Sequence, residues 1–195
     1  GQFLKSAGAG AAPTMAAGGM VQLHTQTITS NTSSISYSST YFTTAYKRYE
    51  LHWDSVRISS DGGNITGQVS ADNGSSYVTS GYNYVRQFDH SGMSNNTIAS
   101  SGGTGNSHMF MSGTGEGIGT AANECGCGLM IMFNPFGENS KLFMTEAVHI
   151  NNSGQVNQNK SYQGLIQSAT WNNFKILPNT GTINAGTFTL YGVSS

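Results

Sequence analysis

Residues 141–151 read KLFMTEAVHIN, and they carry the clearest signal for the fold. Four apolar side chains fall on even positions: Leu142, Met144, Val148 and Ile150. Thr145 and His149 fall on odd positions. Because successive side chains of a strand point to opposite faces of a sheet, this alternation predicts a β-strand. We expect its even positions to face the core, with Glu146 as the exception.

Short apolar or aromatic runs recur along the rest of the chain, separated by clusters of Gly, Asn, Asp and Ser. Such runs predict strands, and such clusters predict turns. The expected strands are 20–29, 46–59, 64–72, 82–90, 107–112, 128–134, 141–151, 162–177 and 186–193. The expected turns are 61–64, 72–74, 134–137 and 152–154. No window has helical periodicity. We therefore expect an all-β chain without significant helix, folded as a jelly-roll-like sandwich of two antiparallel sheets.

The expected strand 46–59 changes face along its length. Three apolar or aromatic residues share one parity at its start: Tyr49, Leu51 and Trp53. Val56 and Ile58 take the other parity. This switch predicts either a β-bulge near Asp54 and Ser55 or a strand that is covered on both faces.

The chain divides into a short leading segment and one domain. Residues 1–20 are small and lack periodicity, so we expect a flexible linker or strap with an extended backbone. Residues 21–195 have the length of a single β-sandwich domain. Within it, 91–106 and 113–124 are rich in Gly, Ser and Asn. They are longer than a turn requires, so we expect them to be disordered or used for binding.

Composition and charge exclude two classes of partner. Ser, Thr, Asn and Gly make up almost half of the 195 residues, and the formal net charge is -1. The basic residues are scattered apart from the adjacent Lys47 and Arg48, so no basic stripe is available for phosphate contacts. The longest apolar run, 129–133, is far shorter than the roughly 20 residues of a spanning helix. We expect no nucleic-acid partner and no membrane insertion.

Titratable and metal-ligating residues form no recognised catalytic motif. Cys125 and Cys127 lack a second cysteine pair, and the single glycine between them disfavours a disulfide, so we expect free thiols and neither metal nor cofactor. Free thiols favour assembly in a reducing cytosol. His52 and Asp54 would share one face of a strand, as an acid–base pair requires, but we expect two solvated residues.

Three tyrosines are candidates for ligand binding. Tyr77, Tyr82 and Tyr84 stand among Ser, Thr and Asn residues. An aromatic ring can pack on the face of a sugar while amides and hydroxyls supply hydrogen bonds, so these residues are the candidate glycan site. In the alternative interpretation, each is a half-buried strand residue with its hydroxyl in water.

The last expected strand is apolar on both faces. Phe188 and Leu190 share one parity, and Tyr191 and Val193 share the other. Such a strand is either central to the sandwich or covered by a neighbouring protomer. These four residues are therefore the candidate oligomer interface.

Two segments resemble parts of tailed-bacteriophage virion proteins. Residues 2–15, QFLKSAGAGAAPTM, resemble the connector before C-terminal domains of fibre and other virion proteins, although Met15 replaces a frequent aromatic residue. Residues 171–195, WNNFKILPNTGTINAGTFTLYGVSS, are similar to the terminal hairpin of β-sandwich domains in those proteins. The resemblance implies a virion surface module with a jelly-roll-like sandwich, often trimeric.

We therefore expect a virion structural domain, at a tail- or head-fibre tip, that binds host-surface glycan instead of catalysing a reaction. It would form a homotrimer, be assembled in the host cytoplasm, and contact other virion proteins through its linker. One alternative is a capsid decoration protein that stabilises the shell. Another is a monomeric carbohydrate-binding module of a secreted enzyme. A polysaccharide depolymerase would need a carboxylate pair, for which Glu116, Glu124 and Glu138 are the candidates.

Overall fold

The structure of the whole chain is a computed structural model. It describes residues 2–5, 9–10, 12, 14–17, 19–92, 98–113, 117–137, 140–167 and 169–194, with the backbone alone for 2–5 and 14–17. Every regular element in these ranges is a β-strand. The prediction of an all-β fold is confirmed for this part of the chain.

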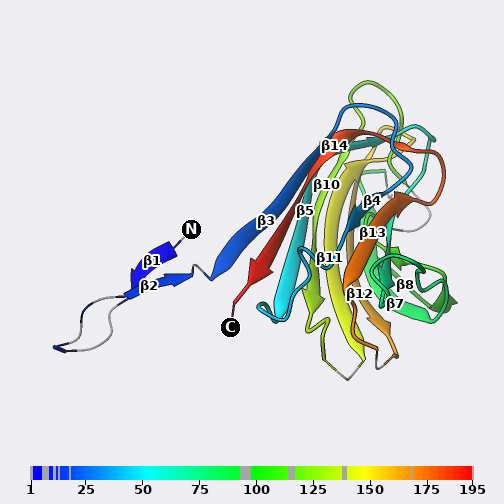
Figure 1. Cartoon of the computed structure of the whole chain (residues 1–195). Coiled ribbons are helices and arrows are strands. Elements are labelled where there is room, and N and C mark those ends of the chain that lie inside the picture. Colours follow the sequence, from blue (N-terminus) through cyan, green and yellow to red (C-terminus); the bar gives the residue numbers. More distant parts are fainter. Residues whose placement is uncertain are drawn as a thin grey trace.

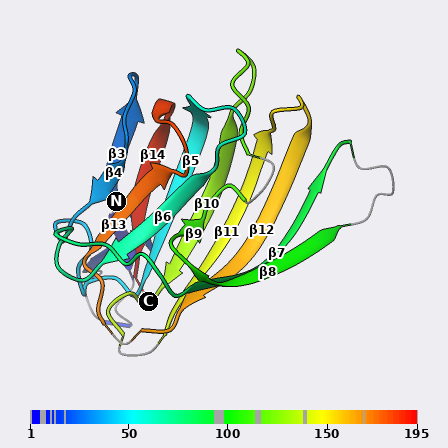
Figure 2. The same ribbon diagram turned by 90° about the vertical axis from the view of Figure 1, so that its right-hand side faces the viewer.

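Two antiparallel sheets pack against each other (Figure 2). The larger sheet has the strand order β3 (Met20–Ile28), β14 (Ile183–Val193), β5 (Arg48–Ile58), β10 (Gly126–Phe133), β11 (Lys141–Ile150), β12 (Val156–Leu165), β7 (Tyr82–His90) and β8 (Ala99–Asn106). The smaller sheet has the order β4 (Ile35–Tyr37), β13 (Asn173–Pro178), β6 (Ile65–Ser70) and β9 (Met109–Phe110). The predicted two-sheet sandwich is confirmed.

The leading segment contains a small hairpin. The backbones of β1 (Gln2–Lys5) and β2 (Thr14–Ala17) pair as antiparallel strands. Figure 1 shows this pair beyond the start of β3, away from the two large sheets. The expected linker therefore contains regular structure in residues 2–5 and 14–17, which the absence of sequence periodicity did not indicate.

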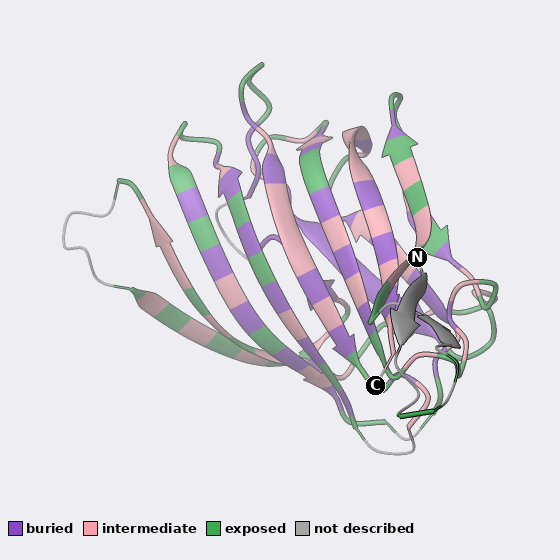
Figure 3. Ribbon diagram, turned by 90° about the vertical axis from the view of Figure 1, so that its left-hand side faces the viewer, coloured by how far each residue is buried: buried purple, intermediate pink, exposed green. Residues whose placement is uncertain are grey.

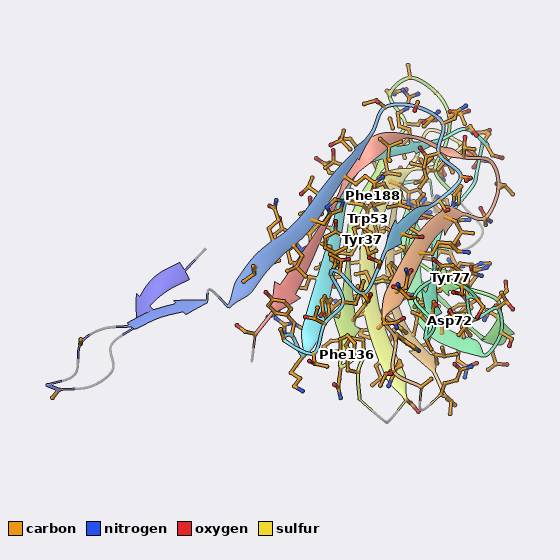
Figure 4. All side chains as sticks on the ribbon, in the orientation of Figure 1. Tyr37, Trp53, Asp72, Tyr77, Phe136 and Phe188 are labelled. Carbon is orange, nitrogen blue, oxygen red and sulfur yellow. The ribbon has the colours of Figure 1, made fainter. Side chains whose placement is uncertain are left out.

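Aromatic and aliphatic side chains from both sheets fill the space between them. Tyr37 of β4, Trp53 of β5 and Phe188 of β14 lie there and are almost completely buried (Figure 4). Gly128 of β10 makes room for the indole of Trp53, because a Cβ atom at this glycine would overlap the ring. Burial of these large side chains is the main source of stability for the sandwich.

The predicted β-bulge in the strand 46–59 is confirmed. The register between β5 and β10 shifts between Gly126 and Gly128, so β5 carries one extra residue at that point. Asp54 and Ser55 are exposed there, and Ser55 has a φ of 53°. The extra residue returns Val56 to the buried face, which explains the change of parity along the strand.

The face assignment of β11 is wrong. Its buried positions are the odd ones: Lys141, Phe143, Thr145, Ala147 and His149. On the even side, Leu142 is 57% exposed and Val148 is 47% exposed. The ring of Phe143 stacks on Trp171 with ring centroids 5.1 Å apart, and this contact fixes the odd side toward the core. Because a strand has period two, one such anchor decides the placement of every side chain.

The prediction of one strand over 162–177 is also wrong. Strand β12 begins at Val156 and ends at Leu165, and β13 begins at Asn173 in the other sheet. The first part of β12 was not predicted as a strand. After Val156, its inward and outward side chains are both polar, so the sequence there has no alternation of apolar and polar residues.

Part of the expected loop 91–106 is the strand β8, at one edge of the larger sheet. Its Gly103 lies against the ring of Tyr84 on β7, so the small residues leave room for a neighbouring aromatic side chain. In the expected loop 113–124, residues 114–116 lie outside the described part. Ile118 forms isolated β-bridges with Gly63, which precedes β6 of the smaller sheet, and with Asn151, which follows β11 of the larger sheet.

Candidate interaction surface

Exposed apolar side chains gather on the side of the larger sheet that faces away from the smaller sheet. Six of them, from β7, β10, β11 and β12, have exposed fractions between 41% and 61%: Val85, Phe133, Leu142, Val148, Val156 and Tyr162. Figure 3 shows buried and exposed residues alternating along these strands. We call this side the outer face. Four of them, Phe133, Leu142, Tyr162 and Val85, lie in neighbouring rows of the sheet, and exposed apolar surface of this kind marks an interaction site.

Strand register brings several apolar residues of the outer face into adjoining rows. Phe133 pairs with Leu142, and Ile131 pairs with Met144, across β10 and β11. Beyond the charged residues of β5, the same two rows continue into β14. We define the apolar strip as Ile131, Phe133, Leu142, Met144, Tyr191 and Val193. Side chains directly opposite each other on one face are close enough to pack together.

The structure separates the four residues of the candidate oligomer interface. Tyr191 and Val193 belong to the apolar strip and are half-buried. Phe188 and Leu190 are fully buried in the core of their own chain. Their assignment to an interface is wrong, because β14 lies between β3 and β5 and the smaller sheet covers its inner side.

Charged residues on the outer face are paired within the chain. Arg48 Nη2 lies 3.2 Å from Glu50 Oε1, and His52 Nε2 lies 3.4 Å from Glu50 Oε2. Lys160 forms an ion pair with Glu146, and the hydrogen bond with this carboxylate raises the pKa of Lys160. These exposed pairs add little stability, but they leave the outer face with few uncompensated charges around the apolar strip.

Tyr162 stands beside three adjoining hollows of the outer face. The largest, about 630 Å³, is lined by Val85, Arg86, Gln87, Ser100, Ser101, Gly102 and Tyr162. A second, about 520 Å³, extends along Gly164 and Thr104. The third, about 310 Å³, extends toward Phe133. The Tyr162 ring is 48% exposed and therefore accessible from these hollows.

Tyr82, one of the candidate glycan-binding residues, is a core residue. It is 1% exposed, its hydroxyl accepts a hydrogen bond from the backbone N–H of Val69, and it donates one to the carbonyl of Val78. Burial raises its pKa. Its assignment to a ligand site is wrong, because these contacts hold the side chain inside the sandwich.

Tyr77 and Tyr84 are partly accessible but lie in different places. Lys175 Nζ lies 3.8 Å from the centre of the Tyr77 ring, beside the smaller sheet (Figure 4). Tyr84 makes an edge contact with Phe110, with ring centroids 5.2 Å apart, and lies against Gly103. Each ring already has a packing partner. The two tyrosines therefore do not form a common platform.

The candidate carboxylates do not form an observed pair. Glu124 is 8% exposed, and its carboxylate accepts a hydrogen bond of 2.6 Å from the backbone N–H of Ala121. It therefore stabilises its own turn. Glu116 and Glu138 lie outside the described residues. Across the described ranges, no three His, Cys, Asp or Glu side chains converge as a metal site would require.

The residues near the bulge make separate contacts. His52 is directed to Glu50 and to the ring of Tyr191, whose centroid is 5.0 Å away. Asp54 accepts hydrogen bonds from Ser55 Oγ and from Cys127 Sγ, each at 3.2 Å. Both cysteines are free, as predicted, and burial raises the pKa of the Cys127 thiol. A thiol with a raised pKa is a weak nucleophile at neutral pH.

A layer of buried polar residues on the inner side of β11 and β12 was not predicted from the sequence. They are Thr145, His149, Asn157, Asn159, Ser161 and Gln163. Gln163 exchanges two hydrogen bonds with the backbone of Phe110, and Thr145 bonds to Ser161 at 2.8 Å. Only the alternating Asn, Ser and Gln of the sequence could have indicated this layer. Hydrogen bonds allow Thr145, Ser161 and Gln163 to replace apolar residues in the interior, whereas the buried amide of Asn159 makes no hydrogen bond to a described residue.

No family model, no curated protein and no solved structure matches this chain. Within the described ranges, no helix is present that is long and apolar enough to cross a membrane.

Proposed function

We propose that this chain is a structural module on the surface of a bacteriophage particle, which acts by binding and assembles as a homotrimer through the apolar strip. The observation that carries the proposal is the exposure of the strip, with Leu142 57% and Phe133 41% exposed on a regular sheet face. An exposed patch of this type is stabilised when a second apolar surface covers it.

The apolar strip has the composition of an interface core. Its six residues include two aromatic residues and one methionine, which protein interfaces concentrate at their centre. The ion pair between Arg48 and Glu50 crosses it, so no uncompensated charge of the strip would be buried by a neighbouring copy. These features favour association of identical chains over contact with a strongly charged partner.

The sequence resemblance supports the virion part of the proposal. The closing residues 171–195, which are similar to the terminal hairpin of phage β-sandwich domains, supply β13 of the smaller sheet and β14 of the larger sheet. The resembling segment therefore joins both layers of the fold. Residues 2–15 resemble a connector, and we propose that they join the module to other virion proteins. Host-surface glycan is the proposed ligand of the assembled particle.

Sedimentation velocity of charged variants tests this function. Leu142→Lys places an ammonium group in the apolar strip, where burial against another copy would require its desolvation. We expect wild type to sediment as a trimer at micromolar concentration and Leu142→Lys as a monomer with unchanged circular dichroism. Ile166→Lys is the matched control, because Ile166 is 75% exposed and lies outside the strip.

Two results would contradict the proposal. One is a wild-type chain that sediments as a monomer, which with sugar binding would favour a detached carbohydrate-binding module. The other is a Leu142→Lys variant that retains the wild-type sedimentation coefficient.

A further inference from the structure

We propose that the hollow between Tyr162 and β8 is a binding site for a neutral pyranose sugar. This inference rests on the proposed function, because it gives the surface module a ligand and a site for it. It moves the sugar site from the tyrosines that the sequence indicated to one that lies on the outer face, beside the apolar strip.

The floor of the hollow is a cross-strand row of three residues. Tyr162 on β12 pairs with Val85 on β7, and Val85 pairs with Gly102 on β8. Tyr162 is 48% exposed and Val85 is 61% exposed, so both present apolar surface to the solvent. Gly102 has no side chain, which keeps the end of the row open. The row can therefore receive the apolar face of a sugar ring, which carries C–H groups and no hydroxyl.

The next row along the same strands is polar. Lys160 pairs with Gln87, and Gln87 pairs with Ser100. Gln87 and Ser100 are exposed, and neither side chain makes a hydrogen bond to another described residue. Their amide and hydroxyl groups are therefore available to the hydroxyl groups of a sugar lying on the first row. An apolar floor beside a polar row matches the two kinds of surface that a pyranose presents.

The Tyr162 ring lies uncovered beside the hollow. Lys160, two residues before it on the same face of β12, is paired with Glu146. The Tyr162 ring makes no contact with the ring of another described residue. In contrast, the Tyr84 ring packs on Phe110. The face of an uncovered ring is available for a ligand to pack on.

Charge and size favour an uncharged ligand of one or two sugar rings. Lys160 is already paired with Glu146, and Arg86 lies over the ring of Phe88 with its Nε donating to Ser101 at 2.7 Å. Arg86 pairs in register with the buried Ser161, so its side chain lies on the side of the sheet opposite Tyr162. Of these two cations, an acidic sugar beside Tyr162 would meet only Lys160, which is already paired with Glu146. The hollow of about 630 Å³ is within the range of small-ligand sites, roughly 300 to 1,000 Å³.

Saturation-transfer NMR tests the site directly. The full chain is mixed with millimolar methyl glycosides of glucose, galactose, mannose and N-acetylglucosamine, and separately with the methyl glycoside of sialic acid. We expect saturation transfer to at least one neutral glycoside. Tyr162→Ala should weaken this binding about tenfold or more, whereas Tyr162→Phe, which keeps the ring, should remain within about threefold of wild type. Gln87→Ala should weaken binding without changing the sedimentation coefficient.

The outcomes separate this site from the assembly. A Tyr162→Ala variant that loses sugar binding but sediments like wild type supports the site. A monomeric wild type that binds sugar through Tyr162 would overturn the assembly and still support the site. The proposal is overturned if wild type binds none of the neutral glycosides, if Tyr162→Ala binds as wild type does, or if the acidic glycoside binds more tightly than every neutral one.

Discussion

Asp72 organises the loop between β6 and β7 through three hydrogen bonds. Its carboxylate accepts from the hydroxyl groups of Ser70 and Ser76, each at 2.6 Å, and from the backbone N–H of Ser76 at 2.9 Å. The hydrogen bond from Ser70, followed by those from Ser76, lowers the pKa of Asp72 from 3.8 to about 2. The ionised carboxylate is therefore stabilised in the folded state.

This shift predicts a pH dependence of stability. Because the pKa is lower in the folded than in the unfolded chain, Asp72 contributes stability above about pH 4 and loses it as the pH falls to about 2. Urea unfolding of wild type and Asp72→Asn should show a difference in the free energy of unfolding that shrinks across this range. Ser76→Ala removes a hydroxyl that donates to Asp72, so the pKa of Asp72 in the folded chain should be lowered less. The pH range over which the stability changes should therefore be narrower. A difference that stays constant from neutral pH to about pH 2 would contradict this prediction.

Single residues were predictable where local chemistry decides their role. The bulge at Asp54 and Ser55 followed from a change of parity that ordinary strand geometry does not allow. The burial of Tyr82 could not be predicted, because its partners, the backbones of Val69 and Val78, meet it only in the folded chain. Tyr162 gave no signal, because its exposure depends on which side of β12 faces outward.

At the scale of elements, the orientation of β11 can be tested directly, because its odd-numbered side chains are buried and its even-numbered side chains are not. The background is a chain with Cys125 and Cys127 replaced by serine, diluted until the chains are monomeric. In this background, Leu142→Cys should react rapidly with a thiol reagent. Phe143→Cys should react only upon unfolding, because Phe143 is 2% exposed. The reaction rates are measured by mass spectrometry. Faster labelling at position 143 than at position 142 would show that the face assignment is inverted.

Elements were predictable where apolar residues alternate with polar ones and turns carry Gly or Asn. The strand 82–90 was predicted with the bounds that β7 has in the structure. The signal fails in β11 and β12, where several apolar residues face outward and several polar residues face inward. Such a pattern inverts the usual distribution, and only long-range contacts such as that of Phe143 with Trp171 settle it.

At the scale of the whole molecule, the two sheets are unequal. The larger sheet has eight strands and the smaller has four, and Figure 2 shows β7 and β8 extending beyond the smaller sheet. The outer face of the larger sheet has no covering layer among the described residues. A second chain can supply that layer over the apolar strip, while the part that carries Tyr162 stays open to a ligand.

The two-sheet architecture was predictable because composition, turn chemistry and the lack of helical periodicity all favour it. The interaction surface was not. The sequence indicated apolar residues on both sides of β14, but the strand order that covers Phe188 and leaves Tyr191 half-buried is a property of the folded sheet.

The molar mass of the unmodified chain in solution, measured by light scattering after size exclusion, tests the central claim most directly. With the apolar strip covered by neighbouring copies, the mass should be about three times the chain mass of 20.5 kDa throughout the micromolar range. A constant mass of 20.5 kDa over the same range would show the outer face bare on a single molecule and would contradict the account.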